Sequence, residues 1–293
     1  MKRIFRKYYE KFILFILKNK YNKHPLAINV LNIEDTLDFI INNHSSVSRF
    51  GDGEINIMSG ESIAYQDYND KLCSELKEIV SLQSNIDFVV CLSDVYKDLN
   101  RYTPHCQIFW YRHLLKYRDI HQKLFTSNWY GSTFISRPYM DLSDKSKSFI
   151  YFDKLKMLWN NRDILIVEGK NSRSGIGNDL FSNANSISRI ICPSKNAYDK
   201  VDLIEKSIIS HAENKLVLLM LGPTAKVLAK RISEKGIWAI DLGHIDSEYE
   251  WFKMGALEKV KLSYKHTAEH NFDEHIVFIN DEEYNKQIII NLS

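Results

Sequence analysis

Two acids separated by a single glycine, Asp52 and Glu54, are the first residues in this sequence that could do chemistry together. They lie in the stretch SRFGDGEINIM at residues 48–58, where glycines precede both acids and apolar residues follow them. On an extended backbone, side chains two residues apart point the same way, so both carboxylates could approach one hard divalent cation, which takes oxygen ligands. Gly51 and Gly53 permit close backbone approach to such an ion. A turn with solvated acids is the alternative interpretation.

A glycine-containing loop, EGKNSRSGIGND, follows an expected strand at 163–167 and is expected to lead into a helix. Backbone amides at the start of a helix bind phosphate, and the planar guanidinium of an arginine there adds a positive charge and two parallel hydrogen-bond donors. The loop contains neither G-x-G-x-x-G nor a G-K-[ST] ending, which removes the main support for a dinucleotide-binding or ATPase site. An ordinary connection between strand and helix is the alternative. The candidate ligand-binding residues in this loop are Glu168, Arg173, Gly175, Gly177, Asn178 and Asp179.

Two further polar clusters follow expected strands. The turn at 221–224, Leu-Gly-Pro-Thr, begins a helix with proline in a favourable position, and Gly222 and Thr224 could contact a phosphate or a ribose. A purely structural turn is the alternative there. The stretch at 241–251 holds four acids and a histidine and could supply a general base, unless it is simply a charged surface loop. The candidate bases, in order of preference, are Glu248 and Asp246, followed by His244.

The elements that would position these clusters alternate between helix and strand. Strands are expected at 47–50, 86–92, 163–167, 189–192, 216–221 and 237–241, and helices at 32–43, 68–81, 199–211, 222–235 and in the second half of 101–122. Continuous apolar strands that alternate with helices predict an α/β fold with a mostly parallel sheet covered by helices on both faces. Ligands bind outside the carboxyl ends of strands in such sheets, and all four clusters follow strand ends. We therefore expect one composite site.

Composition is that of an ordinary globular protein, because 44% of the 293 residues are hydrophobic and 26% are charged. The net charge of +2 gives no general attraction to nucleic acid, so no nucleic-acid partner is expected. Four cysteines without a C-x-x-C pair indicate neither a zinc site nor a redox site. Scattered thiols suit the reducing cytoplasm, which is the expected location.

The first 25 residues differ in charge from the rest of the chain. They carry eight Lys or Arg against one acid, Glu10, a net charge of +7, with aromatic residues at positions 5, 8, 9, 12 and 15. The apolar run at 12–17 is much shorter than the roughly 20 residues of a membrane-spanning helix. A basic helix with aromatic residues is typical of segments that lie on an anionic membrane surface. A helix packed on the protein, with its lysines in water, is the alternative.

Six stretches of the sequence, taken in order, resemble the GT-D-type glycosyltransferases, formerly a domain of unknown function in bacterial surface-glycan clusters. They are RFGDGE at 49–54, TFISRPYMD at 133–141, ILIVEGKNSRSGIGNDLF at 164–181, RIICPSKNAY at 189–198, LGPTAKVLA at 221–229 and AIDLGHIDSEYEWF at 239–252. The resemblance implies a Rossmann-like fold and one such domain at 26–293, after the basic helix at 1–25. It also implies transfer of a sugar from a nucleotide donor, usually a UDP-sugar, with a divalent metal.

The same resemblance assigns roles to particular residues. An Asp-x-Glu motif serves the metal and the diphosphate in that family, which matches Asp52 and Glu54 with Mn²⁺ or Mg²⁺. Arg49, Phe50 and Gly51 join the expected nucleotide-sugar contacts, and Arg137 is a second cationic candidate beside Arg173. An inverting transfer would use the general base, whereas a retaining transfer would need none.

The function expected from these features is metal-dependent transfer of a hexose from a UDP-sugar to a hydroxyl of a bacterial surface glycan. The glycan could belong to a capsule, an exopolysaccharide or a glycoprotein, and a lipid-linked acceptor would bring the enzyme to the inner face of the plasma membrane. A homo-oligomer is left open. The alternatives are a metal-dependent phosphoesterase, which lacks the usual His-rich ligand set here, and a non-catalytic nucleotide-binding protein.

Overall fold

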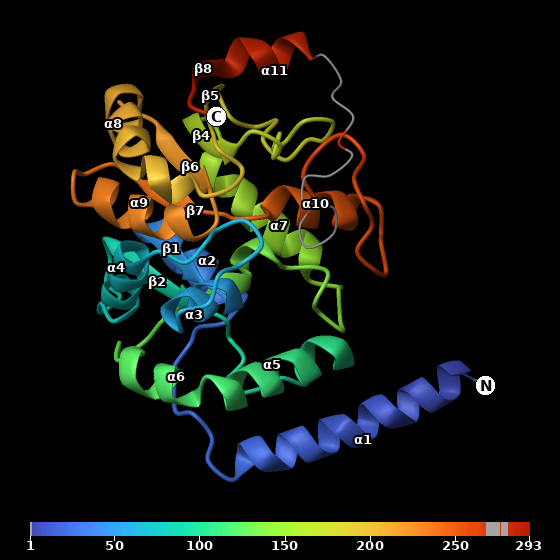
Figure 1. Ribbon diagram of the computed structural model, residues 1–293. Helices are drawn as coiled ribbons and strands as arrows, with labels where there is room; N and C mark the ends of the chain where they lie inside the picture. Colours follow the sequence, from blue (N-terminus) through green and yellow to red (C-terminus); the bar gives the residue numbers. More distant parts are fainter. Residues whose placement is uncertain (1, 268–275, 277–280) are drawn as a thin grey trace.

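A single parallel sheet organises the molecule (Figure 1). The computed structural model describes residues 2–267, 276 and 281–293, with side chains from residue 8 onward. In this part of the chain, eight strands lie in the order β3-β2-β1-β7-β6-β4-β5-β8, and every neighbouring pair is parallel. The expected α/β fold is confirmed. The strands are β1 Ser46–Phe50, β2 Phe88–Leu92, β3 Gly131–Ser132, β4 Asp163–Gly169, β5 Ser186–Cys192, β6 Leu216–Met220, β7 Ala239–Asp241 and β8 Ile288–Asn291.

Helices cover both faces of this sheet. The chain moves in one direction across the sheet through α4, α8 and α9, which contact one another or lie together on one side. It returns in the other direction through α7, which therefore covers the opposite face together with α2, because crossovers between parallel strands are right-handed. The helices are α1 Lys2–Asn22, α2 Ile33–Asn43, α3 Asp52–Met58, α4 Asp70–Val80, α5 Pro104–Lys116, α6 Arg118–Leu124, α7 Ser148–Trp159, α8 Val201–His211, α9 Pro223–Ser233, α10 Ile245–Lys253 and α11 Glu282–Gln287, with 3₁₀ turns η1 Thr133–Ser136 and η2 Ala197–Lys200.

The central strands form because their sequences are apolar on both faces. In β4, Ile164 to Val167 have no exposed surface, and β6 is buried along its whole length. A strand that packs helices against both faces reads as such a continuous apolar run. The cysteines at 73, 91, 106 and 192 are all buried and unpaired.

The structure corrects three local predictions. The backbone at Asp52 is not extended, because Gly51 is the cap residue of α3 and Glu54 bonds back to the Gly51 amide, which starts a helix immediately after β1. Residues 170–185, expected to lead into a helix, form turns and contain no helix. The predicted helix at 101–122 also begins earlier than expected, since Thr103 caps α5 and proline occupies its first position.

The long helix α1 lies at the edge of the molecule and packs against α5 (Figure 1). The side chains of Lys2, Arg3, Phe5, Arg6 and Lys7, which belong to the predicted basic helix, lie outside the described residues. Within the described stretches, no helix has both the length and the apolarity that crossing a bilayer requires.

The strand order creates a crevice between two adjacent strands, β4 and β6, because the segments that follow them run to opposite sides. From β4 the chain goes on to β5 on one side, whereas from β6 it goes on to β7 on the other side. The loops after β4 and β6 therefore separate at the carboxyl edge of the sheet, the arrangement at which open α/β sheets bind ligands.

Candidate functional site

A pocket with a volume of about 210 Å³ opens at the divergence of β4 and β6. Its walls include residues that follow four strands: Ser172 after β4, Lys195 after β5, Gly222 after β6 and His244 after β7. Two aromatic side chains outside these loops, Tyr65 and His266, also line the pocket. The predicted position of the site at the carboxyl edge of the sheet thus coincides with a real cavity.

Aromatic rings form one wall of this pocket. The Tyr65 ring meets the His244 ring edge to face, with centroids 6.0 Å apart. His244 in turn stacks on His266, with centroids 5.1 Å apart and planes inclined by 27°. Gly222 has a φ of +50°, and a Cβ there would lie 2.8 Å from Cε2 of Tyr65, so only glycine fits against this ring. Flat faces of this kind suit a planar base.

The first turn of α3 separates the two acids of the Asp-x-Glu motif. Glu54 is buried, and its Oε2 accepts the Gly51 amide at 2.8 Å while its Oε1 pairs with Nζ of Lys226 at 3.0 Å. Residues two apart on a helix do not face the same side. Glu54 can therefore reach a cation only by giving up one of these bonds, whereas Asp52 is half-buried at the helix start.

The metal site at Asp52 and Glu54 stays a prediction, but the extended backbone expected for it is wrong. The two acids do not form the side-by-side pair that an extended backbone would give. Among the described residues, no three His, Cys, Asp or Glu side chains gather closely enough to hold a metal ion. A carboxylate oxygen still suits Mg²⁺ or Mn²⁺, and Asp52 fits that role better than Glu54.

Arg49 and Asp241 form a buried pair beneath the site. The Arg49 guanidinium contacts Oδ1 of Asp241 through Nη2 at 3.3 Å, and the Arg49 amide donates to Oδ2 at 3.1 Å. Lys226 adds a second cation at 3.1 Å from Oδ2. A Cβ at Gly243 would lie 2.3 Å from Nη2 of Arg49, so the arginine fills the space beneath the loop after β7. Arg49 and the buried Phe50 therefore support the pocket without lining it.

Polar groups at the end of β4 and in the loop after it bond to neighbouring parts of the protein. Glu168 is fully buried, pairs with Arg189 at 2.6 Å and accepts the Ser174 amide at 2.8 Å. The Gly175 amide donates to Oδ1 of Asp246 at 2.7 Å. These amides hold the loop in place, which argues against the predicted phosphate-binding helix start at these positions.

Several other predicted residues of this loop also make structural contacts. The Arg173 guanidinium lies 4.7 Å from the centre of the Tyr284 ring, and Gly177, at a φ of +78°, packs beside Tyr264. Asp179 accepts the Tyr249 hydroxyl and pairs with two lysines. Burial raises the pKa of Asp179, but hydrogen bonds from Lys253, Tyr249 and Lys156 outweigh burial and hold the pKa well below its usual range.

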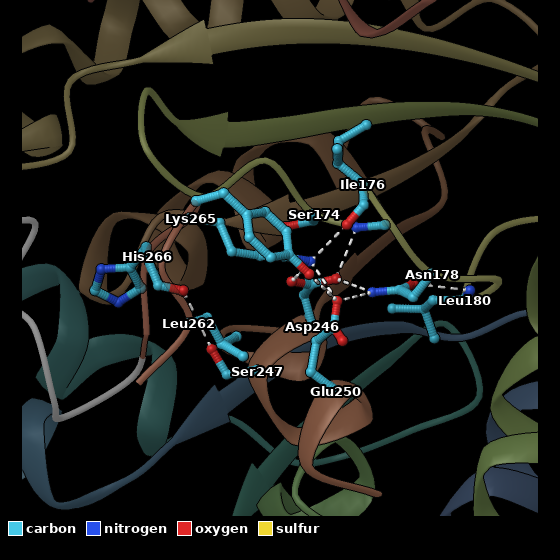
Figure 2. A network of polar contacts seen from close by, with 12 residues as sticks. Ser174, Ile176, Asn178, Leu180, Asp246, Ser247, Glu250, Leu262, Lys265 and His266 are labelled. Atoms are coloured by element: carbon cyan, nitrogen blue, oxygen red, sulfur yellow. Dashed lines mark hydrogen bonds and ion pairs between the residues drawn. The ribbon is translucent and has the colours of Figure 1, made fainter. Parts of the chain in front are cut away.

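Two acids of α10, Asp246 and Glu250, form a second buried network, shown in Figure 2. Nζ of Lys265 lies 2.7 Å from Asp246 and 2.7 Å from Glu250, and Asn178 donates to both carboxylates. Burial alone would lower the pKa of Lys265, but the two carboxylates outweigh it and raise that pKa. The His266 ring points away from this cluster (Figure 2), so the network anchors the segment that carries one wall of the pocket.

Glu248 faces a different part of the protein. Its Oε1 accepts the backbone amides of Tyr139 at 2.9 Å and Met140 at 2.7 Å. Burial raises the pKa of Glu248 to about 7, with Arg137 opposing and Asp141 adding to the rise. Arg137 itself pairs with Asp141 at 3.1 Å, so both of these residues hold the 137–141 loop.

Of the predicted catalytic and sugar-nucleotide residues, the structure brings two into the pocket lining, His244 and Gly222. Thr224 is fully buried in α9. Glu248 and Asp246 are buried and hydrogen-bonded, whereas His244 lines the pocket, and the ranking of the three as general base stays a prediction.

Sequence reasoning missed most of the lining, and four of the missed residues carry polar or aromatic groups that matter for binding. Lys195 and Ser172 each follow an expected strand closely, so the strand-end rule could have found both. Tyr65 and His266 lie far from any strand end in sequence, and no local pattern distinguishes them.

Comparison with known proteins connects this geometry to a family. A family model described as the glycosyltransferase GT-D fold matches residues 47–270. Glycosyltransferase GlyD of Streptococcus pneumoniae is 53% identical over 274 residues, which are 94% of this chain and 34% of the relative. A probable glycosyl transferase, Gly, of Streptococcus gordonii is 52% identical over 266 residues, which are 91% of this chain and 39% of the relative. The chain thus spans little more than a third of the length of these curated relatives.

Solved structures match over their entire length. A glycosyltransferase (DUF1792) from Streptococcus sanguinis has 54% identity and a TM-score of 0.90, covering 91% of this chain and 100% of that one. A structure described as the domain of unknown function 1792 with a distinct glycosyltransferase fold has 51% identity and a TM-score of 0.90, covering 97% of this chain and 100% of that one.

Proposed function

Because this chain belongs to the GT-D-fold family of glycosyltransferases, we propose that it moves a hexose from a UDP-sugar to a hydroxyl of a bacterial surface glycan. The acceptor glycan would be carried on lipid or protein, as part of a capsule, an exopolysaccharide or a glycoprotein. The observation that carries the proposal is the pocket at the divergence of β4 and β6, which combines stacked aromatic rings with a lysine, Lys195, among its lining residues.

The pocket offers distinct surfaces for the parts of a UDP-sugar. The rings of Tyr65, His244 and His266 suit the uracil base, since a base can stack on an aromatic face. Lys195 and the hydroxyl of Ser172 suit the diphosphate, because an ammonium and a neutral donor together can hold phosphate oxygens. Gly222 lets the Tyr65 ring lie directly against the loop after β6, which holds that ring at the pocket wall.

A divalent cation, Mn²⁺ or Mg²⁺, is part of the proposal, with Asp52 as its carboxylate ligand. When bound, such an ion neutralises charge that develops on the diphosphate as the sugar leaves. Glu54 would act on this region through Gly51 and Lys226, whose positions it fixes.

For an inverting transfer, His244 is the proposed general base. Its neutral imidazole nitrogen would take the proton from the acceptor hydroxyl, whose oxygen forms the new bond to the anomeric carbon. The bond between that carbon and the diphosphate oxygen breaks, and UDP leaves with the electron pair. A retaining transfer needs no such base, so a His244 variant that keeps full activity would indicate the retaining course.

The experiment that tests the function is a UDP-release assay with a panel of UDP-sugars, with Mn²⁺ and with a chelator in its place. We expect sugar-dependent release of UDP that requires the metal and falls at least tenfold in Lys195→Ala, since a charge-assisted contact to phosphate is worth about 1.5–3 kcal/mol. The matched control is Lys206→Ala, an exposed lysine on α8. Release of inorganic phosphate from phosphate esters would instead indicate a phosphoesterase, and nucleotide binding without turnover for any acceptor would indicate a binding protein.

A comparison of two variants, one at Asp52 and one at Glu54, tests the proposed metal ligand. Asp52→Asn should abolish the response to Mn²⁺, whereas Glu54→Gln should keep that response and lower the melting temperature, because it breaks a buried ion pair with Lys226. Loss of the Mn²⁺ response in both variants, with unchanged melting temperature, would restore the predicted two-carboxylate site.

A further inference from the structure

Helix α1 carries a ridge of exposed aromatic and aliphatic side chains. The exposed fractions are 70% for Tyr8, 63% for Tyr9, 61% for Phe12, 65% for Phe15 and 45% for Ile16. Among the described helices, no other exposes more than two large hydrophobic side chains. Single exposed apolar residues are normal on a soluble surface, but a contiguous group of this size marks an interaction surface.

The ridge is the outward side of a helix whose inward side is already packed. Leu14 and Leu17 pack against the core, and the Tyr21 ring lies 5.6 Å from the Tyr111 ring of α5. These inward residues recur at the three- and four-residue spacing of one helix face. Since α1 lies at the edge of the molecule (Figure 1), its outward face points away from the remaining elements.

Lysines flank the ridge on both sides. With about 3.6 residues per turn, Lys11 and Lys18 lie on one flank of the line through Tyr8, Phe12 and Phe15, and Lys20 lies on the other. The segment 1–25 has a net charge of +7 from eight basic residues and one acid, so the remaining chain sums to −5. The apolar ridge therefore belongs to the strongly basic part of the chain.

We propose that α1 lies flat on an anionic lipid surface, with the ridge of Tyr8, Tyr9, Phe12, Phe15 and Ile16 inserted among the headgroups. Aromatic rings favour the membrane interface, where one side is apolar and the other wet. The flanking lysines would meet lipid phosphates, each contributing to binding at short range. The lysines on both flanks favour an anionic lipid surface over a neutral apolar protein surface as the occupant. A protein partner would have to supply matching acids on both flanks of the helix.

Vesicle flotation tests the proposal with the full chain. The protein is mixed with vesicles of phosphatidylcholine alone, or of phosphatidylcholine with an equal amount of phosphatidylglycerol. We expect flotation with the anionic vesicles only, and a decrease as salt is added, because salt screens the attraction. Equal flotation with both kinds of vesicle, or none with either, would overturn the proposal.

Two pairs of variants separate the contributions of the ridge and of the charge. Phe12→Ser with Phe15→Ser should weaken binding to anionic vesicles by about tenfold or more, since two apolar side chains no longer insert. The matched control is Phe149→Ser with Met157→Ser, two similarly exposed residues of α7, which should float like the unaltered chain. Lys11→Glu with Lys20→Glu should weaken binding by about fivefold or more per lysine. Lys71→Glu with Lys206→Glu, on other helices, is the charge control.

The oligomeric state distinguishes lipid from a second copy of the chain as the occupant. All variants change exposed side chains, so their melting temperatures should match that of the unaltered chain. A monomer in solution whose flotation follows the ridge and the lysines supports the proposal. A dimer that Phe12→Ser with Phe15→Ser converts to monomer would assign the ridge to protein association and overturn it.

Discussion

The wall of the pocket and the acidic helix α10 are neighbours in sequence but differ in where their polar groups lie, at a cavity or buried inside the protein. His244 lies just before α10 and lines the pocket half-buried. Asp246, two residues later, is buried and accepts hydrogen bonds from the Gly175 amide, Asn178 and Lys265. The stretch richest in acids therefore supplies the internal scaffold, and a single histidine at its edge faces the cavity.

This difference follows from the energetics of buried charge. A carboxylate removed from water needs hydrogen-bond or ion-pair partners. Its lone pairs then accept bonds from those partners and are not available to a substrate. A reactive group needs the opposite condition, which is contact with a cavity that a substrate can enter. The following variants test the contrast between the buried, paired acids of α10 and the pocket wall that a substrate can reach.

The largest expected effect is on stability. Lys265→Met leaves Asp246 and Glu250 without their shared cation and should lower the free energy of unfolding by about 3–5 kcal/mol. Chemical denaturation measures this loss. As a control, Lys253→Met removes a half-exposed pair with Asp179 and should cost about 1 kcal/mol or less. Equal losses in the two variants would show that the α10 cluster is no more than a surface contact.

Glu248→Gln should change how stability depends on pH. The pKa of Glu248 in the folded protein, about 7, lies above its ordinary 4.5, so the folded state binds the proton more tightly. The stability from this group is fully present below about pH 4.5 and is lost as the pH rises through 7. Glutamine keeps the acceptor for the Tyr139 and Met140 amides without the charge.

The variant should therefore be more stable than the unaltered chain at about pH 8, by on the order of 3 kcal/mol, and equally stable at acid pH. Thermal unfolding across this range measures the difference. Sugar transfer should stay within a few-fold of the unaltered rate if Glu248 belongs to the scaffold, and a loss of about a hundredfold would return the role of base to Glu248.

His244→Ala should separate catalysis from stability. Loss of a general base should reduce kcat by about a hundredfold or more, close to 2.7 kcal/mol of activation free energy. The free energy of unfolding should change by about 0.5 kcal/mol or less, since the ring is half-buried at the pocket. His105→Ala, at an exposed position of α5, is the control for kcat. A large stability loss without a change in kcat would place His244 in the scaffold.

The smallest effect concerns donor binding. Tyr65→Leu should weaken UDP binding by about tenfold, because a base stacked on an aromatic ring contributes about 1–3 kcal/mol. Tyr68→Leu, at an exposed position of the same segment, should bind UDP normally. Titration calorimetry compares the two, and equal affinities would move the base away from the wall formed by Tyr65 and His244.

Much of the fold could be predicted because its central strands are apolar on both faces. The runs at 163–167 and 216–221 have one physical explanation, a parallel sheet between two helical layers. That sheet in turn locates ligands at its carboxyl edge, where the pocket lies. Family resemblance added the type of reaction, which no pattern of apolar residues contains.

The chemistry of individual side chains could not be predicted in the same way. The prediction for Asp52 and Glu54 assumes an extended backbone. The contact of Glu54 with the Gly51 amide starts a helix there instead, and Lys226 pairs with Glu54. Asp246 and Glu250 were matched by Lys265, and nothing local in the sequence pairs them. Whether an acid is available depends on such distant partners, which only the folded chain brings together.

The contacts of Tyr65 bear on how the protein folds. Its ring packs on Gly222, and its carbonyl oxygen accepts the amide of Asn196 at 3.0 Å, so one residue from the first half of the chain touches two loops from the second half. The pocket cannot exist until both halves have docked. Nucleotide binding would then indicate that both halves of the chain have folded together, and a partly folded chain would not bind nucleotide.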